Sequence, residues 1–139
     1  MEEIKGNLFS VDEGISLCHC VSRDLEMGRG IAVVFKKKFG RVNELVLQHP
    51  EVGKGAFVKD GERTVFYLVT KENYWEKPRL MDLLLSITWM RDIMVKNGIK
   101  TIAMPRLECG LDKLDWAVVK PSIESIFENS GIKVMCFYI

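Results

Sequence analysis

The sequence contains few residues of the kinds that build metal sites. It has only two histidines, His19 and His49, and four cysteines with no Cys-x-x-Cys pair among them. Neither spacing suggests a zinc site, so we expect no bound metal. Cys18 and Cys20 lie two positions apart in an apolar run, and we expect them to be small buried side chains on one side of a strand.

The sequence also lacks an excess of charge and any long apolar stretch. Its formal net charge is +1, which gives no overall reason to expect nucleic-acid or anionic-membrane binding. No apolar run approaches the roughly 20 residues that span a bilayer. The start Met1-Glu2-Glu3 is acidic, unlike a targeting peptide. We therefore expect an intracellular protein of the cytoplasm, the nucleus or both, with no membrane segment.

Internal repeats and low-complexity linkers are absent as well, so we expect residues 1–139 to form a single domain. The turn dipeptide Asp60-Gly61 indicates a β-hairpin. Alternating strands and helices imply a three-layer α/β/α fold, in which the hairpin makes the central sheet of about six strands mixed. Periodicity and turn signals predict strands at 4–9, 15–21, 56–59, 64–69, 101–104 and 133–138 and helices at 31–39, 42–48, 79–96 and 115–129.

Two predicted loops are expected to meet at one edge of this sheet. Right-handed crossovers place loops 22–30 and 106–112 at the same edge. The first contains Met27-Gly-Arg-Gly30 just before a helix, an arrangement that can cradle phosphate. By itself this pattern is more often a tight turn, and it matches neither the nucleotide P-loop nor the dinucleotide motif.

Two candidate reactive residues are predicted beside these loops. Lys71 follows the second hairpin strand, and Asp112 ends the second loop. Their plain interpretations are a solvated lysine and a helix-capping acid, and their chemical ones are an amine nucleophile and a general acid or base. Because Asp115 is also available to cap the following helix, Asp112 is freer for chemistry. The residues alone support a phosphate-containing ligand at a Lys/Asp site.

Five segments, spread in order over nearly the whole chain, carry a similarity to one family. The sequence resembles the macrodomain family, and within it the terminal ADP-ribose protein glycohydrolases, also described as O-acyl-ADP-ribose deacylases. The five segments are Lys5-Gly-Asn-Leu-Phe9, Leu17-Cys-His-Cys-Val-Ser22, Met27-Gly-Arg-Gly-Ile-Ala-Val-Val-Phe-Lys-Lys-Lys-Phe-Gly40, Tyr67-Leu-Val-Thr-Lys71 and Met104-Pro-Arg-Leu-Glu-Cys-Gly-Leu-Asp112.

The resemblance implies a macrodomain that binds ADP-ribose at the sheet edge and uses no cofactor. It implies that Lys71 attacks the anomeric carbon of the distal ribose and expels the carboxylate of a modified Glu or Asp side chain. Asp112 then accepts a proton and helps to resolve the lysyl–sugar adduct. The ligand-binding positions that it carries over are Asn7, Leu8, Ser22, Met27, Gly28, Arg29, Gly30, Ile31, Arg106, Leu107, Cys109, Gly110, Leu111 and Ile139.

Two positions depart from the pattern of the family. Asn7 stands where an Asp usually accepts a hydrogen bond from the adenine amine, and its amide oxygen can still accept without the charge. Glu108 stands where the phosphate loop usually has Gly. We expect Glu108 to point outward, because a carboxylate pointing inward would repel the diphosphate.

Three functions remain open at this point. The leading one is an enzyme that hydrolyses ADP-ribosyl esters of acidic side chains and O-acyl-ADP-ribose, acting as a monomer on ADP-ribosylated proteins. The second is a module that binds ADP-ribose without cleaving it, although such a reader needs neither Lys71 nor Asp112. The third is removal of ADP-ribose from nucleic acid, which the near-neutral charge does not favour. The phosphate contacts would then come from Lys36–Lys38, Lys54, Lys59 and Lys77.

Overall fold

The computed structural model describes residues 1–109 and 114–139. The strands among them form one mixed six-stranded sheet. The strand order is β1-β6-β5-β2-β4-β3. β3 pairs antiparallel with β4, and the other neighbouring strands are parallel, which confirms the mixed sheet predicted from the hairpin. The strands are β1 (Glu2–Lys5), β2 (Ser16–Ser22), β3 (Gly55–Asp60), β4 (Arg63–Lys71), β5 (Thr101–Pro105) and β6 (Lys133–Tyr138).

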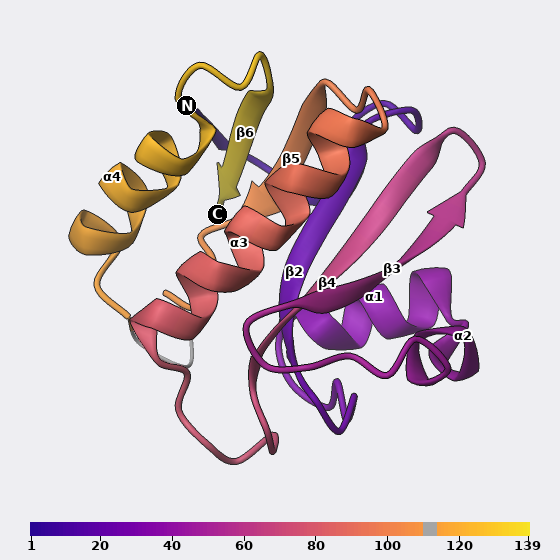
Figure 1. Ribbon diagram of the computed structural model, residues 1–139. Coiled ribbons are helices and arrows are strands. Elements are labelled where there is room, and N and C mark those ends of the chain that lie inside the picture. Colours follow the sequence, from indigo (N-terminus) through magenta and orange to yellow (C-terminus); the bar gives the residue numbers. More distant parts are fainter. Residues whose placement is uncertain (110–113) are drawn as a thin grey trace.

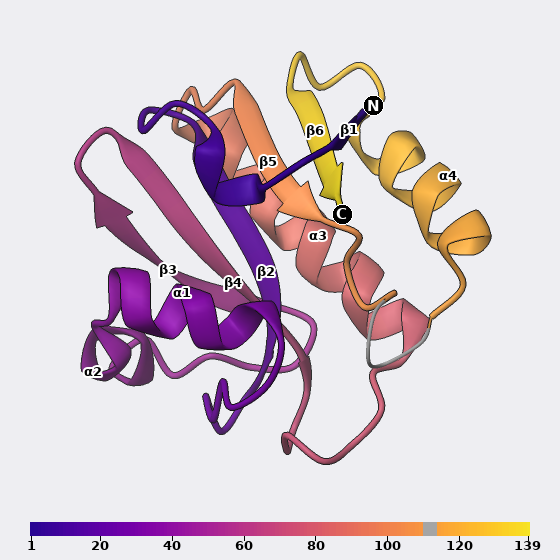
Figure 2. The same cartoon turned by 180° about the vertical axis from the view of Figure 1, so that it is seen from behind.

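Helices cover both faces of this sheet, which confirms the three-layer prediction. α3 (Leu80–Lys96) and α4 (Trp116–Phe127) lie on the face seen in Figure 1. α1 (Ile31–Phe39) and α2 (Val42–Val46) lie on the opposite face, where Figure 2 shows α1 in front of β2 and β4. No helix among the described residues is both long and apolar enough to cross a membrane.

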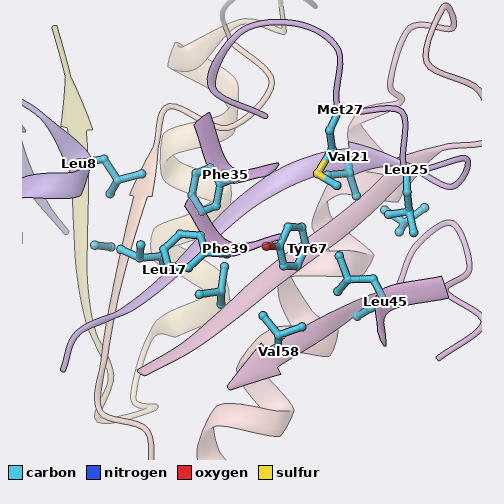
Figure 3. Packing of buried hydrophobic residues seen from close by; sticks show 14 of the residues in the cluster. Leu8, Leu17, Val21, Leu25, Met27, Phe35, Phe39, Leu45, Val58 and Tyr67 are labelled. Atoms are coloured by element: carbon cyan, nitrogen blue, oxygen red, sulfur yellow. The ribbon is translucent and has the colours of Figure 1, made fainter. Parts of the chain in front are cut away.

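The alternation of side chains along β2 divides the core into two clusters. Leu17, His19 and Val21 face α1, and Cys18 and Cys20 share the opposite face, as predicted. Cys18 is buried as predicted, but Cys20 is only partly buried. On the α1 side, Phe35 and Tyr67 pack among aliphatic side chains from the sheet and the neighbouring loops (Figure 3). Because both faces are buried, the central strands consist mainly of apolar residues.

The first predicted strand is wrong in its second half. β1 ends at Lys5, and a short 3₁₀ helix, η1 (Leu8–Ser10), follows. The Asn7 side chain causes this break, because its Oδ1 accepts a hydrogen bond from the backbone N–H of Phe9 at 2.9 Å. An Asn that bonds the local backbone in this way favours a turn over a continued strand.

The topology brings three strand ends to one edge of the sheet. β2, β4 and β5 run parallel, so the loops that follow them leave from the same side. Ser22 in β2 is the register partner of Lys71 in β4. The predicted meeting of loops 22–30 and 106–109 with Lys71 at one edge is therefore confirmed for the described residues.

Candidate functional site

Lys71 occupies the last position of β4. The preceding residues of this strand, from Arg63 to Thr70, are all buried, and Lys71 is the first that is partly exposed. Its backbone carbonyl accepts a hydrogen bond from the N–H of Arg23 at 2.8 Å. The pairing of β2 with β4 shifts register between Val21 and Ser22, an irregularity that re-aims side chains at a strand end.

A cavity of about 230 Å³ opens at this edge. It is lined by Lys71 and by residues of three loops that are distant in sequence: the β2–α1 loop, the β4–α3 loop and the β5–α4 loop. The predicted binding residues Ser22, Met27, Gly28 and Arg29 line it. The other described residues that line it are Cys20, Val21, Glu26, Ala32, Tyr74 and Glu108.

The β2–α1 loop is held in an unusual backbone conformation by two buried side chains. Leu25 and Met27 have φ angles of 56° and 46°, in the left-handed region that non-glycine residues rarely adopt. Their side chains are nearly fully buried in the α1-side core, whereas Glu26 and Gly28 between and after them are exposed. Burial of the two apolar side chains offsets the backbone strain, so the core determines the shape of the loop.

The N-terminus of α1 meets the cavity without a side-chain cap. Gly30 precedes the helix, the first turn has no acidic residue, and Ala32 in that turn lines the cavity. The uncapped N–H groups and the helix dipole give this end a partial positive charge. The end of the cavity at α1 is therefore suited to an anionic group such as a phosphate.

Asp24 joins two of the loops and was missed at the sequence level. Its carboxylate accepts hydrogen bonds from the Ser22 hydroxyl, from the N–H of Glu26 at 3.1 Å and from the N–H of Tyr74 at 3.0 Å. Burial opposes its ionisation, but these three hydrogen bonds and the nearby Lys71 charge lower the pKa of Asp24. The Ser22-x-Asp24 pattern directly after a buried strand was the available signal for this turn.

Glu108 points into the cavity, which contradicts the outward orientation expected from the sequence. Its Oε1 accepts a hydrogen bond from the hydroxyl of the buried Thr70 at 3.2 Å. The cause lies in the backbone, because Glu108 has a φ of 60° and the preceding Leu107 is anchored in the core. This conformation turns the carboxylate toward the end of β4, where Lys71 also lies.

Sequence comparisons with known proteins identify the family of this chain. The chain is 43% identical to the human ADP-ribose glycohydrolase OARD1 over 134 residues, covering 96% of this chain and 88% of that protein. The chain is a hydrolase of the macrodomain family, in its ADP-ribose glycohydrolase branch. The bovine ADP-ribose glycohydrolase OARD1 is 42% identical to this macrodomain over the same length. A scan against family models found no match.

Solved structures support the fold at lower sequence identity. The macrodomain of Mycobacterium tuberculosis DarG is 20% identical and superposes with a TM-score of 0.88, covering 99% of this chain and 97% of that one. Thermosipho africanus DarTG, solved in complex with ADP-ribose, gives a TM-score of 0.82 at 22% identity and covers 98% of this chain and 41% of that one.

In this macrodomain the Arg106 side chain does not line the described cavity wall. Its guanidinium lies over the Tyr138 ring at 4.5 Å and the Trp116 ring at 5.5 Å, and it is 3.5 Å from the Glu3 carboxylate. Glu3 also accepts hydrogen bonds from the indole N–H of Trp116 at 3.0 Å and from Lys120 at 2.7 Å. Arg106 thus ties the β5–α4 loop to the strands at the far end of the sheet.

Several other predicted binding residues that the structure describes do not line the cavity. Asn7 uses its amide oxygen to cap η1, Leu8 beside it is buried, and Ile139 is fully exposed at the chain end. Leu107 is buried, and burial raises the pKa of the Cys109 thiol to about 11. Gly110, Leu111 and Asp112 lie outside the described residues. Asp115 caps α4 through the N–H of Ala117 at 2.9 Å, as predicted.

The described cavity wall combines the Lys71 amine, the Glu108 carboxylate and the uncapped N-terminus of α1. In the part of the chain that the structure describes, no three His, Cys, Asp or Glu side chains are grouped to hold a metal ion. The described groups suit covalent or acid–base chemistry on a ligand that carries phosphate.

Proposed function

We propose that this macrodomain hydrolyses the ester that links ADP-ribose to Glu or Asp side chains, and also O-acyl-ADP-ribose, with Lys71 as the nucleophile. The observation that carries the proposal is that Lys71 shares one cavity with the β2–α1 loop and the uncapped start of α1. The human relative is named as an ADP-ribose glycohydrolase, and the structurally similar DarTG was solved with ADP-ribose.

In this proposal the helix end holds the diphosphate and thereby places the distal ribose at Lys71. Backbone N–H groups at the start of α1 are preorganised donors for phosphate oxygens. The left-handed β2–α1 loop keeps them in position because its buried side chains cannot move without opening the core. The ligand is therefore oriented before chemistry starts, which lowers the entropic part of the barrier.

The proposed reaction has two steps. The Lys71 amine attacks the anomeric carbon of the distal ribose, and the bond to the ester oxygen breaks so that the carboxylate of the modified side chain leaves. We assign the proton lost by the lysine to Asp112. Water then adds to the lysyl–sugar adduct and releases ADP-ribose and the free amine.

The proposed function is tested by following ADP-ribose release from a protein modified on glutamate. We expect release of free ADP-ribose and, after incubation with ADP-ribose, a mass increase that maps to Lys71. Binding of ADP-ribose with no release would instead establish a reader module. Release from a modified oligonucleotide but not from the modified protein would establish the nucleic-acid alternative.

Glu108 is expected to weaken the binding of ADP-ribose. Because its carboxylate lies in the same cavity as the proposed diphosphate site, like charges repel. Glu108→Gln keeps the shape and the Thr70 contact and removes the charge. We expect its dissociation constant for ADP-ribose to fall by about threefold to tenfold, an effect of about 1 kcal/mol, in calorimetry at low ionic strength.

A matched substitution controls for the loss of one negative charge. Glu62 is exposed at the hairpin end of β4, at the opposite end of this strand from Lys71. We expect Glu62→Gln to leave the dissociation constant unchanged. Weaker binding by Glu108→Gln would contradict the repulsion.

A further inference from the structure

Two exposed aromatic side chains lie next to each other on the rim of the cavity. Tyr74 is 51% and Trp75 is 69% exposed, and their rings meet edge to face with centroids 5.2 Å apart. Most large aromatic side chains are at least partly buried, and adjacent exposed ones commonly mark an interaction surface. None of the steps proposed above uses them.

The turn that carries this aromatic pair is fixed before any partner binds. Glu76 Oε1 accepts hydrogen bonds from the backbone N–H of Asn73 at 2.7 Å and from its side-chain amide at 3.1 Å. The N–H of Glu76 donates back to the Asn73 carbonyl at 3.1 Å. Asp24 holds the N–H of Tyr74 from the β2–α1 loop. A preformed turn loses little conformational entropy on binding, so little of the free energy gained by contact with its aromatic rings is spent on ordering the loop.

The aromatic pair lies at the cavity from which the leaving group of the proposed reaction, the modified polypeptide, departs. Tyr74 lines the same cavity as Lys71, and the exposed Trp75 ring contacts the Tyr74 ring. Figures 1 and 2 show the β4–α3 loop extending beyond the sheet edge beside the β2–α1 loop. With ADP-ribose in the cavity, this rim offers the chain that carries the ester one way out.

We propose that Tyr74 and Trp75 form a platform that binds the polypeptide carrying the ADP-ribosyl ester. This inference rests on the proposed function and adds the part of the substrate beyond the sugar. The platform contacts apolar and cationic side chains of that polypeptide, which pack on aromatic faces.

A polypeptide suits this rim better than a nucleic acid. Nucleobases also stack on aromatic rings, but binding of their backbone needs an excess of positive charge. Here acidic and basic side chains nearly balance, because Glu26 and Glu108 line the cavity with Arg29 and Lys71, and Arg23 is engaged with Glu72 at 3.3 Å.

Trp75→Ala tests the platform by comparing a large and a small substrate of the same reaction. We expect kcat/KM for release of ADP-ribose from a glutamate-modified protein to fall about tenfold, mainly through KM, because Trp75 contacts only the polypeptide. Hydrolysis of O-acetyl-ADP-ribose, which lacks the polypeptide, is expected to stay within twofold of wild type. Trp75→Phe should restore most of the activity on the protein substrate.

Leu47→Ala is the matched control, because Leu47 is 75% exposed and directly follows α2, away from the cavity. We expect it to change neither activity. The platform would be overturned, with the proposed function left intact, if Trp75→Ala released ADP-ribose from the modified protein at the wild-type rate. An equal loss of kcat/KM on the modified protein and on O-acetyl-ADP-ribose would have the same consequence. A loss confined to an ADP-ribosylated oligonucleotide would overturn the choice of partner. A wild-type protein that hydrolyses neither substrate would overturn the proposed function and the platform with it.

Discussion

Lys71→Ala is expected to lower the rate of ADP-ribose release by at least about a thousandfold while leaving ADP-ribose affinity within a few-fold of wild type. The amine is the proposed nucleophile, and the cavity wall that the structure describes holds no second lysine. The fold should survive, because Lys71 contributes to the sheet through its backbone carbonyl and its side chain is only partly buried. Single-turnover release and calorimetry measure the two quantities separately.

Two further variants sharpen this result. Lys71→Arg keeps the positive charge but has no nucleophilic amine, so it is expected to be as inactive as Lys71→Ala. Lys59→Ala removes a lysine at the remote hairpin end of β3 and should behave as wild type. Substantial turnover by Lys71→Arg would mean that the lysine acts by its charge, and the covalent mechanism would then be wrong.

Acid is expected to destabilise this protein through His19. The imidazole is fully buried, stacks on Phe35 with ring centroids 3.8 Å apart and meets Tyr67 edge-on at 4.9 Å. Neither ring nitrogen has a hydrogen-bond partner among the described residues. Burial lowers the pKa of His19 from 6.5 to about 3, so the folded protein keeps the ring neutral where the unfolded chain protonates it.

The direction of the pH effect follows from this pKa difference. Between pH 6.5 and about 3 the unfolded state binds more protons at this site, so the free energy of unfolding falls as the pH is lowered through that range. Above pH 6.5 the His19 ring is neutral in both the folded and the unfolded state, so it does not lower the free energy of unfolding there. With about 1.4 kcal/mol for each pKa unit, the loss near pH 3 is on the order of 4 kcal/mol.

Urea unfolding of the wild type and of His19→Phe at several pH values between 7 and 4 measures this effect. Phe can take the same stacked position on Phe35 and does not titrate, so the variant should lose less stability on acidification. His49→Asn is the control, because His49 is exposed and its φ of 51° suits Asn. Parallel pH dependence in wild type and His19→Phe would show that other groups cause the acid sensitivity.

Local sequence signals were sufficient for most of the secondary structure. The apolar spacing and the following Gly40 predicted α1 at its observed bounds, and Asp60-Gly61 predicted the β3–β4 hairpin. These succeed because helix periodicity, helix ends and tight turns depend on residues only a few positions apart. The first strand was overextended because the side chain of Asn7 competes for the backbone, a choice that periodicity does not report.

The sequence by itself determined the α/β architecture, the family and the placement of Lys71 at the end of a buried strand. Only the tertiary structure decided which side chains share its cavity and which way they point. Asp24 and Tyr74 meet across 50 positions, and Glu108 turns inward to Thr70 across 38. Arg106, in contrast, turns away to stack on Tyr138 and Trp116. Such directions depend on backbone angles and on contacts between distant segments, which become available only when the sheet brings its strand ends together.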